Sequence, residues 1–135
     1  MVDNAYTMIK EMKESGIVSF GAHTYDHVTL ENISEIDKER QFYEANRKIA
    51  EWTGTAPLDL CFPKGIYTEE SLDYMIKNAP YNRLWTSLMQ YSECIDGKIV
   101  FGRAAISGDE PFSVFVNKLN GYYNCFSNLK GKKGF

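Results

Sequence analysis

The stretch Gly21-Ala22-His23-Thr24-Tyr25-Asp26-His27 holds the only two histidines of this 135-residue chain, four positions apart. A short apolar run, Ile17-Val18-Ser19-Phe20, precedes it and is bounded by Gly16 and Gly21. Such a run is typical of a buried strand in a parallel sheet, so we expect a strand over residues 17–21. Parallel α/β folds collect ligands and catalytic groups at the carboxyl ends of their strands, which is where the histidines then lie.

Two imidazoles at this spacing point to a metal site. Imidazole is a common ligand of zinc and related divalent metals, and an i, i+4 spacing on a helical turn places both rings on one side. His23 and His27 are therefore candidates to bind one cation together. An arbitrary pair of histidines is more often two polar residues on a surface turn, but the position after a predicted buried strand favours the metal interpretation.

Helices and strands are expected to alternate along the chain. Met8, Ile9 and Met12 have helical spacing and predict a helix over residues 3–15 that ends at Gly16. Ser34 resembles a capping residue and Gly54 a stop signal, so a long helix is expected over residues 34–53. Its apolar side is expected to consist of Ile36, Tyr43, Ile49, Ala50 and Trp52.

The second half of the chain continues this alternation. Residues 58–62 predict a strand closed by Pro63-Lys64-Gly65, and Thr68 caps a helix that runs to Asn78. Strands are expected over 83–88 and 98–106, joined by a polar segment over 92–97. Pro111 begins a last helix whose inward side is expected to consist of Phe112, Phe115, Val116 and Leu119. This order indicates an α/β fold with a mostly parallel sheet.

Composition narrows the function classes. With 44% hydrophobic residues, the chain is expected to form one globular domain over residues 1–123, followed by a tail over 124–135. A net charge of -3 argues against nucleic-acid binding, because phosphate contacts need clustered Lys and Arg, and the basic cluster Lys130-Gly131-Lys132-Lys133 lies in the tail. No apolar stretch is long enough for a membrane span and no secretory signal precedes Lys10, so a soluble chain is expected.

The three cysteines predict no metal motif of their own. Cys61, Cys94 and Cys125 are too widely spaced for a Cys-x-x-Cys zinc site and odd in number for a disulfide framework. We expect reduced and mostly buried thiols. A nucleophilic cysteine paired with a histidine is a less favoured alternative, because Cys61 lies inside an apolar strand run and the two histidines are better explained together.

The histidine motif, with Leu30 after it, resembles the G-x-H-[ST]-x-x-H motif of the polysaccharide deacetylase family, the NodB homology domain. In that family a long helix, a glycine and a strand ending in a P-Y-G element follow, and this chain has the helix over 34–53, Gly54 and Cys61-Phe62-Pro63-Lys64-Gly65. The Gly102-Arg103 strand and the helix over 112–119 look like the last elements of the branch that acts on biofilm-type exopolysaccharides. The resemblance covers roughly residues 10–121.

The resemblance implies a distorted (β/α) barrel that removes N-acetyl groups from amino-sugar polymers with one divalent metal, zinc or alternatively cobalt or nickel. His23 and His27 match the two histidine ligands, and the backbone N–H of Lys64, between Pro63 and Gly65, matches the oxyanion donor. Thr24 matches a position whose hydroxyl supports the loop. The implied partner is an N-acetylated oligo- or polysaccharide.

Parts of the family pattern have no counterpart in this chain. It lacks the opening strand with an Asp-Asp motif, which supplies a general base and a third metal ligand, and it lacks the late catalytic histidine. Cys61 stands where many members have an arginine. The expected fold is therefore an incomplete barrel, and the chain is expected to be a fragment of a longer enzyme, a split or truncated gene product, or a non-catalytic remnant. Candidate substitute carboxylates are those of Asp26, Asp109 and Glu110.

Two readings other than an enzyme follow from the same residues. A carbohydrate-binding module would stack sugar rings on aromatic side chains, for which the candidates are Tyr25, Tyr67, Trp85 and Tyr91. An interaction domain would cover an open sheet edge with a partner or a second copy, which predicts a homo-oligomer.

Overall fold

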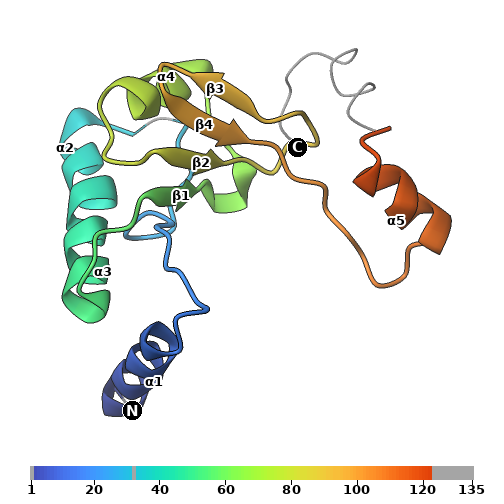
Figure 1. Ribbon diagram of the computed structural model, residues 1–135. Helices are drawn as coiled ribbons and strands as arrows, with labels where there is room; N and C mark the ends of the chain where they lie inside the picture. Colours follow the sequence, from blue (N-terminus) through green and yellow to red (C-terminus); the bar gives the residue numbers. More distant parts are fainter. Residues whose placement is uncertain (1, 32, 123–135) are drawn as a thin grey trace.

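A small sheet lies at the centre of the computed structural model, which describes residues 2–31 and 33–122. Within these residues the strands are β1 (Asp59–Cys61), β2 (Arg83–Trp85), β3 (Glu93–Ile95) and β4 (Lys98–Phe101). Their order across the sheet is β1-β2-β4-β3 (Figure 1). The β1–β2 and β2–β4 pairs are parallel, and β3 runs antiparallel to β4. The prediction of an α/β fold with a mostly parallel sheet is confirmed.

The two faces of the sheet differ in burial. Leu60, Leu84 and Val100 occupy matching positions in β1, β2 and β4 and are almost completely buried. They form the core together with side chains from the helical layer and the segments next to it, chiefly Phe42, Met75, Ile76 and Tyr81. Because successive residues of a strand point to opposite faces, Asp59, Cys61, Arg83 and Trp85 lie on the other, more open face.

All four expected helices are present among the described residues. Helix α1 spans Val2–Glu14, α4 spans Glu69–Lys77 and α5 spans Phe112–Leu119. The long helix is divided into α2 (Glu35–Lys38), a π-helical stretch η1 (Glu39–Glu44) and α3 (Ala45–Thr53), which run on as one column beside the sheet (Figure 1). Both of its predicted ends are confirmed: Ser34 Oγ accepts a hydrogen bond from the Asp37 N–H, and Gly54 caps the other end at φ 73°.

The predicted apolar side of the long helix is partly wrong. Ile36 is 86% exposed and Trp52 is 44% exposed, whereas Gln41, Phe42 and Ala45 are buried. The π-helical stretch explains the difference, because hydrogen bonds to the fifth residue back shift the register of everything downstream. Tyr43 and Ile49 do pack against the core, so a 3.6-residue period counted from Ile36 identifies only part of the buried face.

Other expectations are corrected at the edges of the fold. The predicted strand over 17–21 is absent, and Ile17 is 89% exposed; the segment pairs with the sheet only through Ala22, opposite Leu60. The polar segment over 92–97 contains β3. Phe112 and Leu119 of α5 are exposed rather than inward, because no described residue covers that side of the helix. Cys94 is exposed, contrary to the expectation of mostly buried thiols, and Cys125 lies outside the described residues.

No helix among the described residues is long and apolar enough to cross a membrane. The expected C-terminal tail over 124–135 belongs to the part of the chain that the structure does not describe.

Candidate metal centre

The two histidines lie in a loop attached to the edge of β1. The N–H of Ala22 donates to the Asp59 carbonyl oxygen at 2.8 Å, and the N–H of Cys61 donates to the Ala22 carbonyl oxygen at 3.0 Å. This parallel bridge places His23, the next residue, beside the end of β1. The histidines thus lie at the carboxyl end of a strand, although that strand is β1 rather than the predicted strand over 17–21.

The two imidazole rings are neighbours. Their centroids are 4.7 Å apart and their planes are inclined at 63°. The loop between them is not the helical turn that the spacing suggested, because Thr24 and His27 have left-handed backbones with φ 61° and 57°. The left-handed conformations of these two residues form a turn between the histidines, and this turn, instead of a helical one, brings the rings together. The two rings therefore lie close to each other, which is a precondition for binding one cation together.

A backbone contact orients the ring of His23. Its Nδ1 lies 2.7 Å from the carbonyl oxygen of Cys61. A carbonyl oxygen can only accept, so this contact favours the tautomer with the proton on Nδ1 and leaves the lone pair of Nε2 free to bind a metal. Metal-binding histidines generally donate their second N–H to such an acceptor. The donor chemistry of His23 therefore fits a metal ligand.

Asp26 is engaged away from the imidazole pair. Its carboxylate accepts hydrogen bonds from Gln41 Nε2 at 2.8 Å and from Arg40 NH2 at 3.0 Å. The hydrogen bond from Gln41, followed by the one from Arg40, lowers the pKa of Asp26 below its ordinary value. An ionised carboxylate held in this way is a weak proton acceptor, which disfavours Asp26 as a general base.

These contacts predict a pH-dependent effect of Asp26→Asn. A lowered pKa in the folded state stabilises the fold at pH values above the unfolded-state pKa of about 4. That contribution is lost as the pH falls through the still lower folded-state pKa. We expect Asp26→Asn to lower the thermal midpoint at pH 7 and to leave it unchanged near pH 2. A midpoint difference that is constant between these pH values would contradict the assignment.

The predicted oxyanion donor lies in the turn that follows β1. Pro63–Gly65 form a 3-10 turn, η2, in which Lys64 has a left-handed backbone at φ 54°. Gly65 also has a positive φ, of 68°, and a Cβ there would collide with the side chain of Ser87. Glycine is therefore required at position 65, which accounts for the match to this part of the family motif.

The predicted role of Thr24 has no visible basis in the loop. Its Oγ1 is buried and has no hydrogen-bond partner among the described residues. The loop is instead held by Gln41, whose Oε1 accepts the N–H groups of Tyr25 and Asp26. Sequence reasoning missed Gln41, because glutamine in a helix is ordinarily exposed and carries no motif.

A cleft of about 580 Å³ opens on the sheet face next to His23. Side chains from β1 and β2 line it, including those of Asp59, Arg83 and Trp85, and Arg103 contributes from the segment after β4. Asp59 pairs with Arg83 and accepts a hydrogen bond from Trp85 Nε1 at 2.9 Å. The prediction did not include Asp59. Its spacing of two from Cys61 was the usable signal, because that spacing puts both side chains on one face.

The other predicted carboxylates and aromatic rings are dispersed. Asp109 accepts from Ser107, and Glu110 pairs with Lys118. Of the four aromatic candidates, only Trp85 lines the cleft beside His23, where it stacks on Phe101 with centroids 4.1 Å apart. The other three candidates lie elsewhere. Tyr67 packs on Phe62, and the ring of Tyr25 lies 5.0 Å from the guanidinium group of Arg40. Tyr91 is 56% exposed.

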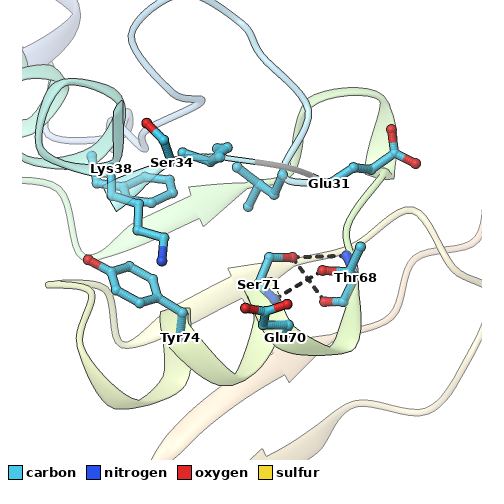
Figure 2. Close-up of a pocket in the computed structure, with 10 residues that line it drawn as sticks. Glu31, Ser34, Lys38, Thr68, Glu70, Ser71 and Tyr74 are labelled. Atoms are coloured by element: carbon cyan, nitrogen blue, oxygen red, sulfur yellow. Dashed lines mark hydrogen bonds between the residues drawn. The ribbon is translucent and has the colours of Figure 1, made fainter. Parts of the chain in front are cut away.

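A second pocket, of about 320 Å³, contains neither histidine. It lies between the segment that follows the histidine loop and the first turn of α4 (Figure 2). Thr68 and Ser71 cap α4 at its wall with reciprocal hydrogen bonds, and the amino group of Lys38 lies 3.9 Å from the centre of the Tyr74 ring. The hydroxyl groups of Thr68 and Ser71 are thus engaged in capping the helix.

The described residues supply too few ligands for a complete metal site. No three His, Cys, Asp or Glu residues among those described come together as a metal site. Catalytic zinc sites normally use three protein ligands. His23 and His27 fit two of those positions, and at least one more ligand would have to come from elsewhere.

The chain was compared with curated protein sequences and with solved structures. No curated protein sequence matches the chain significantly. The crystal structures that match include two with a TM-score of 0.69 each: BA0330 of Bacillus anthracis, assigned as a polysaccharide deacetylase, at 23% identity, and BC0361, a polysaccharide deacetylase of Bacillus cereus, at 21% identity. Both alignments cover 84% of this chain but only 35% and 36% of the other chains, so this chain spans about a third of their length.

These structural likenesses establish the shared fold, and a match to a sequence family establishes the relationship. The family model for polysaccharide deacetylases matches residues 1–83, which is more than half of the chain and includes the histidine loop and β1. The chain therefore belongs to the polysaccharide deacetylase family.

Proposed function

We propose that this domain belongs to a hydrolase that removes N-acetyl groups from amino-sugar polymers with a divalent metal, and that His23 and His27 are two of the metal ligands. The observation that carries the proposal is the imidazole pair, with centroids 4.7 Å apart and His23 Nδ1 held by the Cys61 carbonyl oxygen. Imidazole is a common ligand of zinc in proteins, and cobalt and nickel are alternatives.

Each part of the site would have a separate role. The bound metal would polarise the acetyl carbonyl group and make a water molecule more acidic. His23 and His27 would hold the metal at the mouth of the cleft, with the Cys61 carbonyl oxygen fixing the orientation of the His23 ring. The backbone N–H of Lys64 would donate to the oxyanion that forms when the carbonyl group is attacked. Asp26 would act on the loop through Arg40 and Gln41 rather than on the proton of the water.

The cleft next to His23 is the proposed place for the N-acetylated oligo- or polysaccharide. Trp85 lies in its lining, and an aromatic ring of this kind packs well against the apolar face of a sugar. We further propose that the open face and edge of the sheet are covered by a partner or a second copy, which sizing by light scattering would detect as a mass above 15.5 kDa.

A zinc titration tests the metal ligands. Calorimetry on the unaltered protein should show one zinc ion per chain, with an affinity that falls on acidification because imidazole must lose its proton to bind. We expect His23→Ala and His27→Ala each to weaken binding tenfold or more, because each removes one ligand.

Cys94→Ser is the matched control. Its thiol is exposed and could bind zinc on its own, so this variant separates adventitious binding from binding at the loop. The proposal requires Cys94→Ser to bind like the unaltered protein. Unchanged affinity in the double variant His23→Ala, His27→Ala would refute it.

A further inference from the structure

Gln41 is a buried polar side chain whose hydrogen bonds all go to the histidine loop. It lies in the π-helical stretch η1 and is only 4% exposed. Its Oε1 accepts the N–H groups of Tyr25 at 3.1 Å and Asp26 at 3.0 Å, and its Nε2 donates to Asp26 Oδ2 at 2.8 Å. A buried amide without partners is costly, so these three bonds account for the burial of Gln41.

The bonds act on the residues that determine where the two rings lie. Tyr25 and Asp26 are the middle of the turn between His23 and His27, and the left-handed residues Thr24 and His27 flank them. Left-handed backbone is unfavourable for residues other than glycine, so such a turn persists only when its surroundings hold it. Gln41 supplies that hold from a different element of the fold.

The element that carries Gln41 is itself fixed. The neighbouring residue Phe42 is buried in the core, and its carbonyl oxygen accepts a hydrogen bond from the buried hydroxyl of Tyr81 at 3.2 Å. The π-helical geometry of η1 buries the two consecutive side chains of Gln41 and Phe42 together. Single π-helical turns often occur at functional sites, and this one joins the core to the loop.

We propose that Gln41 is a positioning residue that sets the relative placement of the His23 and His27 imidazoles, and through it the affinity of the loop for a divalent metal. The claim about metal affinity rests on the proposed function, whereas the claim about the placement of the two rings does not. Arg40 has a lesser part, because its partner Asp26 is exposed and the two side chains meet in solvent.

The test uses two substitutions of matched size. Gln41→Met keeps the volume of the side chain and removes all three hydrogen bonds, whereas Gln41→Glu keeps an acceptor for the two N–H groups and loses the donor to Asp26. Loss of a group that orients a metal ligand typically weakens metal binding about 10–100-fold. We expect both variants to weaken zinc binding by about that factor, Gln41→Met because all three hydrogen bonds are lost and Gln41→Glu because its carboxylate would repel that of Asp26.

Asn46→Ala is the control. Asn46 is also a buried amide on the long helix, and its Oδ1 has no hydrogen-bond partner among the described residues. Its removal should perturb the helix without touching the loop, so zinc affinity should stay within twofold of the unaltered protein. An equal loss in Asn46→Ala and Gln41→Met would reduce the role of Gln41 to general stability and overturn the proposal.

A measurement without metal separates this inference from the proposed function. Nuclear Overhauser contacts between the ring protons of His23 and His27 should be visible in the metal-free protein and should vanish in Gln41→Met but persist in Asn46→Ala. If the unaltered protein binds no zinc, the proposed function fails while this contact still tests the positioning. Ring contacts that survive intact in both Gln41→Met and Gln41→Glu would overturn the inference even if zinc binds.

Discussion

Residues 1–135 alone are expected to deacetylate N-acetylated sugar oligomers about a hundredfold to ten-thousandfold more slowly than a complete polysaccharide deacetylase. The factor is the usual contribution of a positioned general base. The described residues offer two imidazoles and one backbone donor, but the candidate carboxylates are all engaged. Asp59, which shares the cleft with His23, pairs with Arg83, and Asp26 pairs with Arg40. Asp109 accepts a hydrogen bond from Ser107, and Glu110 pairs with Lys118. A metal with too few ligands would lower occupancy as well.

The assay should follow acetate release from N-acetylglucosamine oligomers at saturating zinc. The matched comparison is a version of the chain lengthened by a strand with the family's Asp-Asp motif. Its deacetylation rate should exceed that of residues 1–135 by about a hundredfold to ten-thousandfold. A rate from residues 1–135 equal to that of the lengthened version would contradict this account. Asp59 would then be the first residue to substitute, because it shares the cleft with His23.

Phe62→Ala is expected to cost about 3–5 kcal/mol of unfolding free energy, the usual range for removing a buried aromatic ring. Phe62 is 1% exposed, and its ring packs on Tyr67 with centroids 4.9 Å apart. Its N–H donates to the Trp85 carbonyl oxygen at 3.0 Å, which ties the end of β1 to β2. Because small domains are stable by only about 5–15 kcal/mol, this loss would remove a large share of the total.

Urea unfolding followed by tryptophan fluorescence measures the effect. Phe112→Ala is the matched control, because Phe112 is 77% exposed and its loss should stay within about 0.5 kcal/mol. Equal changes in the two variants would show that the region around β1 is not the core that the burial pattern indicates.

The ends of helices were predictable because their signals are local. Ser34, Gly54 and Thr68 each act through the backbone within a few residues, and all three cap helices as expected. The buried face of the long helix was only partly predictable, because the π-helical stretch η1 changes the period without a sequence signature. The strand over 17–21 failed for a related reason: burial of an apolar run depends on a neighbouring layer, and Ile17 has none among the described residues.

Part of the candidate site could likewise be predicted from the sequence, and part could not. The imidazole pair was predictable, because the two histidines are close in sequence and a loop between them is short enough to bring their rings together. Gln41 and the Cys61 carbonyl oxygen were not, since one is a single helical side chain and the other a backbone atom that any residue could supply. Long-range partners of this kind become visible only when the fold brings them to the loop.

The most direct test of the central claim is anomalous diffraction at the zinc absorption edge from crystals of the zinc-loaded protein. This account predicts a peak about 2.0–2.1 Å from an imidazole nitrogen of both His23 and His27. A peak bound to only one of these rings, a peak at Cys94, or no peak at the loop in crystals grown with saturating zinc would contradict it.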